Sequence, residues 1–140
     1  DFPKLRQKAL HLLQEEAELN EIVQLVGVDS LSFTDRLKLE TAKSIREDYL
    51  HQNAFHEIDT FTSTTKQYLL LKMILGWHEA AIKAVCEGGS FKKITEMSAR
   101  EQIGRFKYVE EAKIQEQYEA ILAEMTAEFD EIVQKEAELA

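Results

Sequence analysis

The stretch that decides the fold runs from Asn20 to Phe61 and reads NEIVQLVGVDSLSFTDRLKLETAKSIREDYLHQNAFHEIDTF. Its first part carries Ile22 and Val26 at helical spacing, directly before Gly27. Helices often end at a residue with positive φ, which glycine adopts without a steric penalty. We therefore expect one helix to end at Gly27.

The second part of this stretch predicts another helix. A short polar loop at residues 29–35 contains Ser32 and Asp35, which are spaced to cap the first helical turn, an interaction worth about 1 kcal/mol. The following apolar residues keep helical spacing to about His51, and an extended segment at Phe55–Phe61 follows. The stretch thus predicts two helices joined by a loop, with aromatic residues after the second helix.

Working outward from this stretch, helical patterns fill the rest of the chain. Further helices are expected at about residues 3–26, 65–86 and 98–108, and the pair Gly88 and Gly89 ends the second of these. Residues 90–93 are expected to form a turn. The first helix is expected to pack on its neighbours through one stripe, Leu5, Ala9, Leu12, Leu19, Ile22, Val23 and Val26. The last helix has the stripe Ile114, Tyr118, Ile121, Leu122, Met125, Phe129, Ile132 and Val133.

The composition fits one all-α domain, a bundle of about four to five helices. The chain has 140 residues with one proline and five glycines, so long stretches are free of helix breakers. Its net charge of -9 disfavours nucleic acid or an anionic membrane surface as a partner. The longest apolar run, residues 68–71, is far shorter than the ~20 residues of a membrane span, so direct membrane insertion is not expected. The single Cys86 is expected to be a buried, reduced thiol.

The central stretch resembles the C-terminal helical domain of the catalytic A subunit of V/A-type rotary ATPases. The resemblance is carried by Leu19–Gly27 with Asp29, then by Leu31, Ser32 and Asp35–Leu37, and by Gln52–Phe55 with Glu57 and Asp59. A similar spacing occurs in the more distant catalytic beta subunit of other rotary ATP synthases. The resemblance is strongest from Phe2 to His78. It implies that the chain, residues 1–140, is a single C-terminal domain of a larger subunit whose nucleotide-binding domain precedes residue 1, with residues 90–140 as a helical extension of the same bundle.

The resemblance also implies a binding site for the rotating central stalk. In the family, the loop after the glycine has the sequence Asp-Glu-Leu-Ser-Glu-Glu-Asp, and without gaps it aligns with Asp29, Ser30, Leu31, Ser32, Phe33, Thr34 and Asp35. Ser30, Phe33 and Thr34 replace acidic residues of that motif. Shape and apolar contact are therefore expected to contribute more to stalk binding here than charge does.

A second implied site concerns adenine. The same alignment places Phe55, Ile58 and Phe61 on residues that, in the beta subunit, wall the adenine pocket. An aromatic face stacks on a purine for about 1 to 3 kcal/mol. Without the resemblance, the two phenylalanines are interpreted as core residues.

The chain carries no motif for holding a triphosphate. A Gly-rich loop ending in Gly-Lys-Ser/Thr is absent, so ATP and Mg²⁺ are expected only in the full subunit, and no catalytic residue or cofactor is assigned to this chain. His56-Glu57 and His78-Glu79 begin like a zinc-protease motif but lack the second histidine, so no metal site is expected. His11, His51 and His56 are expected at the surface or in turns, and His78 as a hydrogen-bonded core histidine.

Two charged features favour no ligand. The acidic pairs Glu15-Glu16 and Glu110-Glu111 are most simply interpreted as solvated faces, with partner binding as the alternative. The basic concentration is too small to indicate nucleic-acid binding; it comprises Lys92, Lys93, Arg100, Arg105 and Lys107.

From these observations we predict a domain that transmits nucleotide-driven closure to the central stalk of a rotary ATPase. Its expected partners are the central-stalk subunit and the noncatalytic B subunits, in a cytoplasmic, peripheral membrane complex. One alternative is a free-standing acidic helical adaptor, which explains composition and periodicity equally well but leaves the loop spacing unexplained. Another is the noncatalytic subunit of the same complex, which is expected to differ in the segment Glu21–Gly27.

Overall fold

The computed structural model describes residues 2–50 and 64–139, with side chains to residue 136, and these residues form an all-α fold without strands. The α-helices of this part of the chain are α1 (Phe2–Val26), α2 (Phe33–Ser44), α4 (Thr64–Cys86), α5 (Phe91–Thr95), α6 (Ser98–Arg105) and α7 (Ile114–Leu139). Four short segments accompany them: 3₁₀ turns η1 (Val28–Ser30), η3 (Phe106–Tyr108) and η4 (Glu111–Lys113), and the π-helical η2 (Ile45–Leu50), which continues α2. With α5 as a single turn, five longer helices confirm the predicted bundle.

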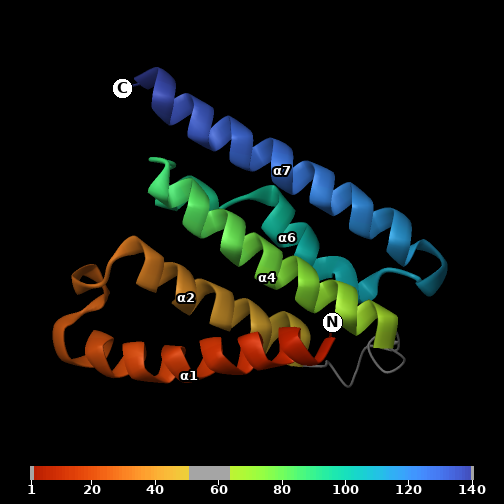
Figure 1. Ribbon diagram of the computed structural model, residues 1–140, viewed down its shortest axis with the longest axis horizontal. Coiled ribbons are helices and arrows are strands. Elements are labelled where there is room, and N and C mark those ends of the chain that lie inside the picture. The colour runs from red at the N-terminus through yellow and green to blue at the C-terminus, as the bar shows by residue number, and fades with distance from the viewer. Residues whose placement is uncertain (1, 51–63, 140) are drawn as a thin grey trace.

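The helices are arranged in three layers (Figure 1). Helices α1 and α2 form an antiparallel hairpin, α4 with α6 lies in the middle, and α7 covers the other side. Helix α4 packs against α1, α2, α6 and α7. The hairpin therefore has its joining loop at one end, and the first residues of α1 lie at the other end.

The core is centred on α4, as its apolar pattern predicts. Leu71, Met73 and Trp77 of α4 are at most 1% exposed, and the hairpin contributes Leu37 and Ile45, which are fully buried. Burial of one such side chain contributes about 1.5 to 3 kcal/mol to folding. The stripe predicted for the last helix is confirmed, since its members are buried or half-buried in α7.

Several local predictions are wrong. The stripe predicted for the first helix holds only in part: Ile22 and Val26 are exposed, because α1 extends beyond the helices that cover it. Its other members are buried or half-buried, namely Leu5, Ala9, Leu12, Leu19 and Val23. Cys86 is exposed, because it lies in the last turn of α4. The turn expected at residues 90–93 is the start of α5, capped by Ser90, whose Oγ accepts from the backbone N–H of Lys93.

The acidic pair Glu15-Glu16 is not a freely solvated face. Glu15 accepts from Lys38 Nζ at 2.6 Å, and Glu16 binds the Arg46 guanidinium at 2.6 and 3.1 Å. The hydrogen bond that Lys38 donates to Glu15 raises the pKa of Lys38. We call α2 together with η2, Phe33–Leu50, the α2–η2 arm. Both acidic side chains therefore bind α1 to this arm, and the sequence pattern did not predict these contacts.

Candidate functional site

The loop that joins α1 to α2 carries the predicted stalk-binding residues. Gly27 has φ 87°, as predicted from the sequence, and ends α1. Ser32 is the N-cap of α2, and its Oγ accepts from the backbone N–H of Asp35 at 3.2 Å, which confirms the predicted cap. Leu31 is only 8% exposed and anchors the loop on the bundle.

The polar groups of this loop are largely satisfied within the loop itself. Ser30 Oγ donates to the carbonyl of Gly27 at 2.8 Å, and the hydroxyls of Ser32 and Thr34 lie 3.1 Å apart. Asp29 lies 3.6 Å from Arg36 of the first turn of α2. The Ser30 bond, together with the Ser32 cap, fixes the backbone of the loop locally.

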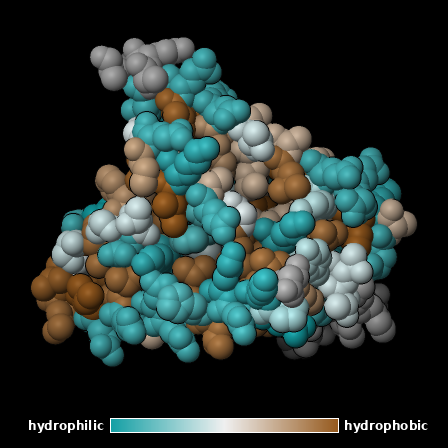
Figure 2. Space-filling view, viewed as in Figure 1, coloured by the Kyte–Doolittle hydropathy of each residue, from teal (hydrophilic) through white to brown (hydrophobic). Residues whose placement is uncertain are grey.

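Apolar side chains project from the same end of the molecule. Figure 2 shows apolar atoms gathered where α1 meets α2. The exposed members are Ile22, Leu25, Val26, Val28 and Phe33, of which Leu25 is 84% and Phe33 50% exposed. We call these five residues the loop patch. Contiguous exposed apolar residues on a folded domain are typical of a surface that binds another protein.

The Phe33 side chain packs against residues of α5 and α2. Its ring stacks on Phe91 of α5, with centroids 5.1 Å apart and an interplanar angle of 17°, and the Arg36 guanidinium lies 5.3 Å from its centroid. One face of the ring is therefore packed while half of the side chain remains exposed. This arrangement presents an aromatic surface at a fixed position.

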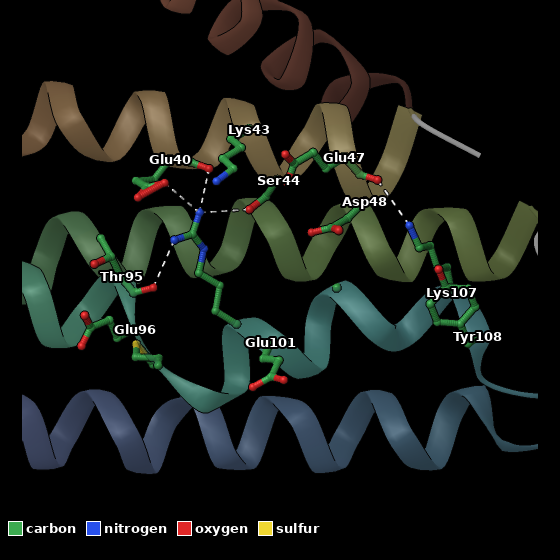
Figure 3. Close-up of a pocket in the computed structure, with 13 residues that line it drawn as sticks. Glu40, Lys43, Ser44, Glu47, Asp48, Thr95, Glu96, Glu101, Lys107 and Tyr108 are labelled. Carbon is green, nitrogen blue, oxygen red and sulfur yellow. Dashed lines mark hydrogen bonds and ion pairs between the residues drawn. The ribbon is translucent and has the colours of Figure 1, made fainter. Parts of the chain in front are cut away.

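A second feature is a groove of about 790 Å³ (Figure 3). One wall is the α2–η2 arm, and the other is the segment Phe91–Tyr108, which we call the α5–η3 stretch. Arg100 spans the groove, with Nη2 donating to the carbonyl of Glu40 at 2.9 Å and to Ser44 Oγ at 3.3 Å. Lys107 donates to the carbonyl of Glu47 at 3.3 Å near the other end. Two basic side chains, both from the α5–η3 stretch, thus cross the groove to reach the α2–η2 arm.

Asp48 lies inside this groove between the two crossings. It is half-buried and makes no hydrogen bond or ion pair among the described residues. Burial raises the pKa of its carboxyl above the usual value, which Lys107 partly offsets. A Cβ at Gly104 would lie 3.3 Å from Asp48 Oδ1, so the glycine lets the carboxylate approach α6.

The structure describes two of the four histidines, one buried and one exposed. His78 is 8% exposed and its Nδ1 lies 2.6 Å from Thr41 Oγ1, so the predicted core histidine is confirmed. Burial lowers the pKa of His78, and the positive charge of Lys38 adds to this effect. His11 is exposed, as predicted, while His51 and His56 lie outside the described residues.

The structure describes only part of the predicted sites. Phe55, Ile58 and Phe61, the residues assigned to the adenine pocket, lie outside the described residues. Within residues 2–50 and 64–139, no group of acidic, histidine or cysteine side chains is arranged to hold a metal ion. No helix in those same ranges is long and apolar enough to cross a membrane.

The basic residues near the end of the chain do not form one surface. Arg100 and Lys107 cross the groove, and Arg105 pairs with Glu101 in its own helix at 2.9 Å. Sequence analysis missed the bridge from Arg100 to Glu40, because 60 residues separate the two and no local pattern connects them.

Comparison with known proteins places the chain in a family. Residues 1–95 match the family described as the C-terminal domain of V and A type ATP synthase. The chain is 51% identical over 138 residues to the V-type ATP synthase alpha chain of Acetivibrio thermocellus, covering 99% of this chain and 23% of that one. It is 50% identical over 135 residues to that of Clostridium botulinum, covering 96% and 23%. With that of Thermoanaerobacter pseudethanolicus it is 56% identical over 114 residues, covering 81% and 19%.

The chain spans about a quarter of the length of these relatives or less, since the covered share is 23% or 19%. The resemblance inferred from the central stretch is confirmed, because both the family match and the relatives agree with it. The chain therefore belongs to the family of C-terminal domains of V- and A-type ATP synthases, as the helical domain of an alpha, or catalytic A, chain.

Proposed function

We propose that this domain transmits nucleotide-driven closure of a preceding nucleotide-binding domain to the central stalk of a rotary ATPase. The contact is made by Asp29–Asp35 with the adjoining loop patch. The observation that carries the proposal is the chemistry of this loop, whose polar groups bond to one another while apolar side chains face outward. Exposed apolar side chains gathered at one end of a folded domain suit a protein partner.

The shape of the hairpin supports a mechanical role. Helix α1 has 25 residues, which at 1.5 Å per residue makes it about 38 Å long. The loop lies at one end and the first residues of α1, where the preceding domain would join, lie at the other (Figure 1). A small rotation near the first residues is therefore a larger displacement at the loop. Packed helices resist continuous deformation and so suit a lever.

The remaining expectations become parts of the same proposal. In the complete chain, ATP and Mg²⁺ bind in the preceding domain, and Phe55, Ile58 and Phe61 wall its adenine pocket. The partners are the central-stalk subunit and the noncatalytic B subunits, in a complex at the cytoplasmic side of a membrane. Phe61→Ala is expected to raise the dissociation constant for nucleotide, and a direct binding titration giving an unaltered value would return Phe61 to the core.

The experiment that tests the stalk contact is Phe33→Ala in the complete synthase. We expect fewer ions to be moved per ATP hydrolysed, with nucleotide affinity unchanged, because the ring lies in the loop patch and its loss leaves the distant nucleotide site intact. Leu10→Ala is the matched control, since Leu10 is 57% exposed on α1 but precedes Gly27 by 17 residues, about 26 Å along the helix. Unchanged pumping per ATP in the Phe33 variant would rule the proposal out.

A further inference from the structure

The α5–η3 stretch runs alongside the α2–η2 arm and touches it at regular intervals. The contacts pair Phe33 with Phe91, Glu40 with Arg100, and Glu47 with Lys107. The three positions on the arm are seven residues apart, which is about two helical turns, so they lie on one face. Residues 91–108 therefore contact the α2–η2 arm along its length, beginning at the proposed stalk loop.

Arg100 is the central contact and has the most partners. Its Nη2 donates to the Glu40 carbonyl at 2.9 Å, to Glu40 Oε2 at 3.3 Å and to Ser44 Oγ at 3.3 Å. Its Nη1 donates to the Thr95 carbonyl at 3.2 Å, and the guanidinium carbon lies 4.7 Å from the Trp77 ring centroid. One side chain on α6 thus joins α2, α5 and α4, and Figure 3 shows the bonds reaching Glu40, Ser44 and Thr95.

The chemistry of these contacts requires a guanidinium. A guanidinium is planar and has five N–H donors, so it can stack flat on an aromatic ring while it serves several acceptors, whereas an ammonium has three donors and no plane to stack. The Arg100 side chain is 18% exposed, so water competes for these bonds less than it does at the surface. Arg105, on the same helix, has a side chain that is 67% exposed and has an ion pair only within α6.

We infer that Arg100 is a positioning residue that fixes the α2–η2 arm to the helices after residue 95, so that force at the stalk loop is carried by one rigid body. This inference rests on the proposed function, and it assigns a bracing role to Arg100, which lies beyond the part that matches the family, residues 1–95. Without the Arg100 bridge, the arm keeps its contacts at Phe91 and Lys107 but loses the polar bonds that join Glu40 and Ser44 to α6.

The test is Arg100→Ala in the complete synthase, with Arg105→Ala as the matched control. We measure ATP hydrolysis and ion transport on the same preparation and take their ratio. Loss of a coupling element is expected to lower the ions moved per ATP by about 2-fold or more, while hydrolysis continues. Hydrogen exchange of the α2 amides around Glu40 and Ser44 is expected to be about 10-fold faster in the Arg100 variant alone.

Leu25→Ala, measured in the same assay, separates the two ideas, because Leu25 lies in the loop patch, is 84% exposed and is not among the contacts between the arm and residues 91–108. If it lowers the ratio but Arg100→Ala does not, the bracing role is overturned and the stalk contact stands. If neither variant lowers the ratio, the proposed function falls and the bracing role falls with it. Should Arg100→Ala fail to assemble, Arg100→Lys decides by the same ratio, because it keeps the charge but lacks the guanidinium. A wild-type ratio in the lysine variant would then overturn the inference.

Discussion

The N-terminus of α6 is capped by a side chain of α7, and removal of that side chain is expected to lower the free energy of unfolding. The backbone N–H of Ser98 donates to Glu128 Oε2 at 3.0 Å, and that of Ala99 donates to Glu128 Oε1 at 2.6 Å. The Ser98 hydroxyl donates to Glu124 of α7 at 2.7 Å. The first N–H groups of a helix have no partner within it, so the Glu128 carboxylate replaces the local cap. Glu128→Ala is expected to destabilise the junction of α6 with α7.

The size of the effect follows from these two bonds. Loss of a side-chain N-cap costs about 0.5 to 2 kcal/mol, and a hydrogen bond to a charged group contributes about 1.5 to 3 kcal/mol. Because Ala99 is fully buried while Ser98 is exposed, the Ala99 bond contributes more. We expect a total loss of about 2 kcal/mol, which for a chain of 140 residues lowers the Tm by about 7 °C.

The measurement is thermal unfolding of the 140-residue chain followed by circular dichroism, with urea unfolding as a second estimate. Glu131→Ala is the control, because Glu131 is exposed on the same helix and pairs only with Lys135 one turn away. Such a pair is worth less than about 1 kcal/mol. Glu128→Gln, which keeps an acceptor but loses the charge, is expected to fall between the two. A Tm for Glu128→Ala equal to that of the control would refute the capping argument.

Two further predictions concern buried ionisable groups. The pKa of His78 is lowered by burial, so protonation favours the unfolded chain, and stability is expected to fall as the pH drops through 6.5. His78→Asn is expected to remove this dependence, which is at most about 1.4 kcal/mol per pH unit, and urea unfolding from pH 8 to pH 5 checks it. The pKa of Asp48 is raised by burial, so its ionisation opposes folding as the pH rises above 3.8. Asp48→Asn is expected to raise stability at pH 7 by less than about 1 kcal/mol, and the gain should vanish in unfolding curves near pH 4.

Much of the fold could be predicted because it depends on local chemistry. The stripe of α7 follows from helical periodicity, and the end of α1 at Gly27 follows from the positive φ that only glycine adopts easily. Ser32 caps α2 because its Oγ reaches an N–H three residues away. Each of these features is encoded within a few residues of the chain.

The predictions that failed depend on contacts between distant residues. The cap of α6 comes from a distant residue, because the backbone N–H of Ser98 donates to Glu128 of α7 while the Ser98 side chain bonds to Glu124. The exposure of Ile22 could not be predicted because periodicity defines a face but not the length over which a neighbour covers it. The bond between Arg100 and Glu40 likewise has no local signal, because the two residues are 60 positions apart in the sequence.

The stiffness that the proposed function needs can be judged from how α2 is held. If the arm were fastened on one side only, a load at the stalk loop would bend it away from the bundle. Instead, polar bonds fix it on separate sides to α1, to α4 and to α6, in addition to its apolar packing. Under the proposed function, a load that displaces the arm from the bundle has to break at least one of these bonds. The bonds are Lys38 to Glu15 and Arg46 to Glu16 on α1, Thr41 to His78 on α4, and Glu40 to Arg100 on α6.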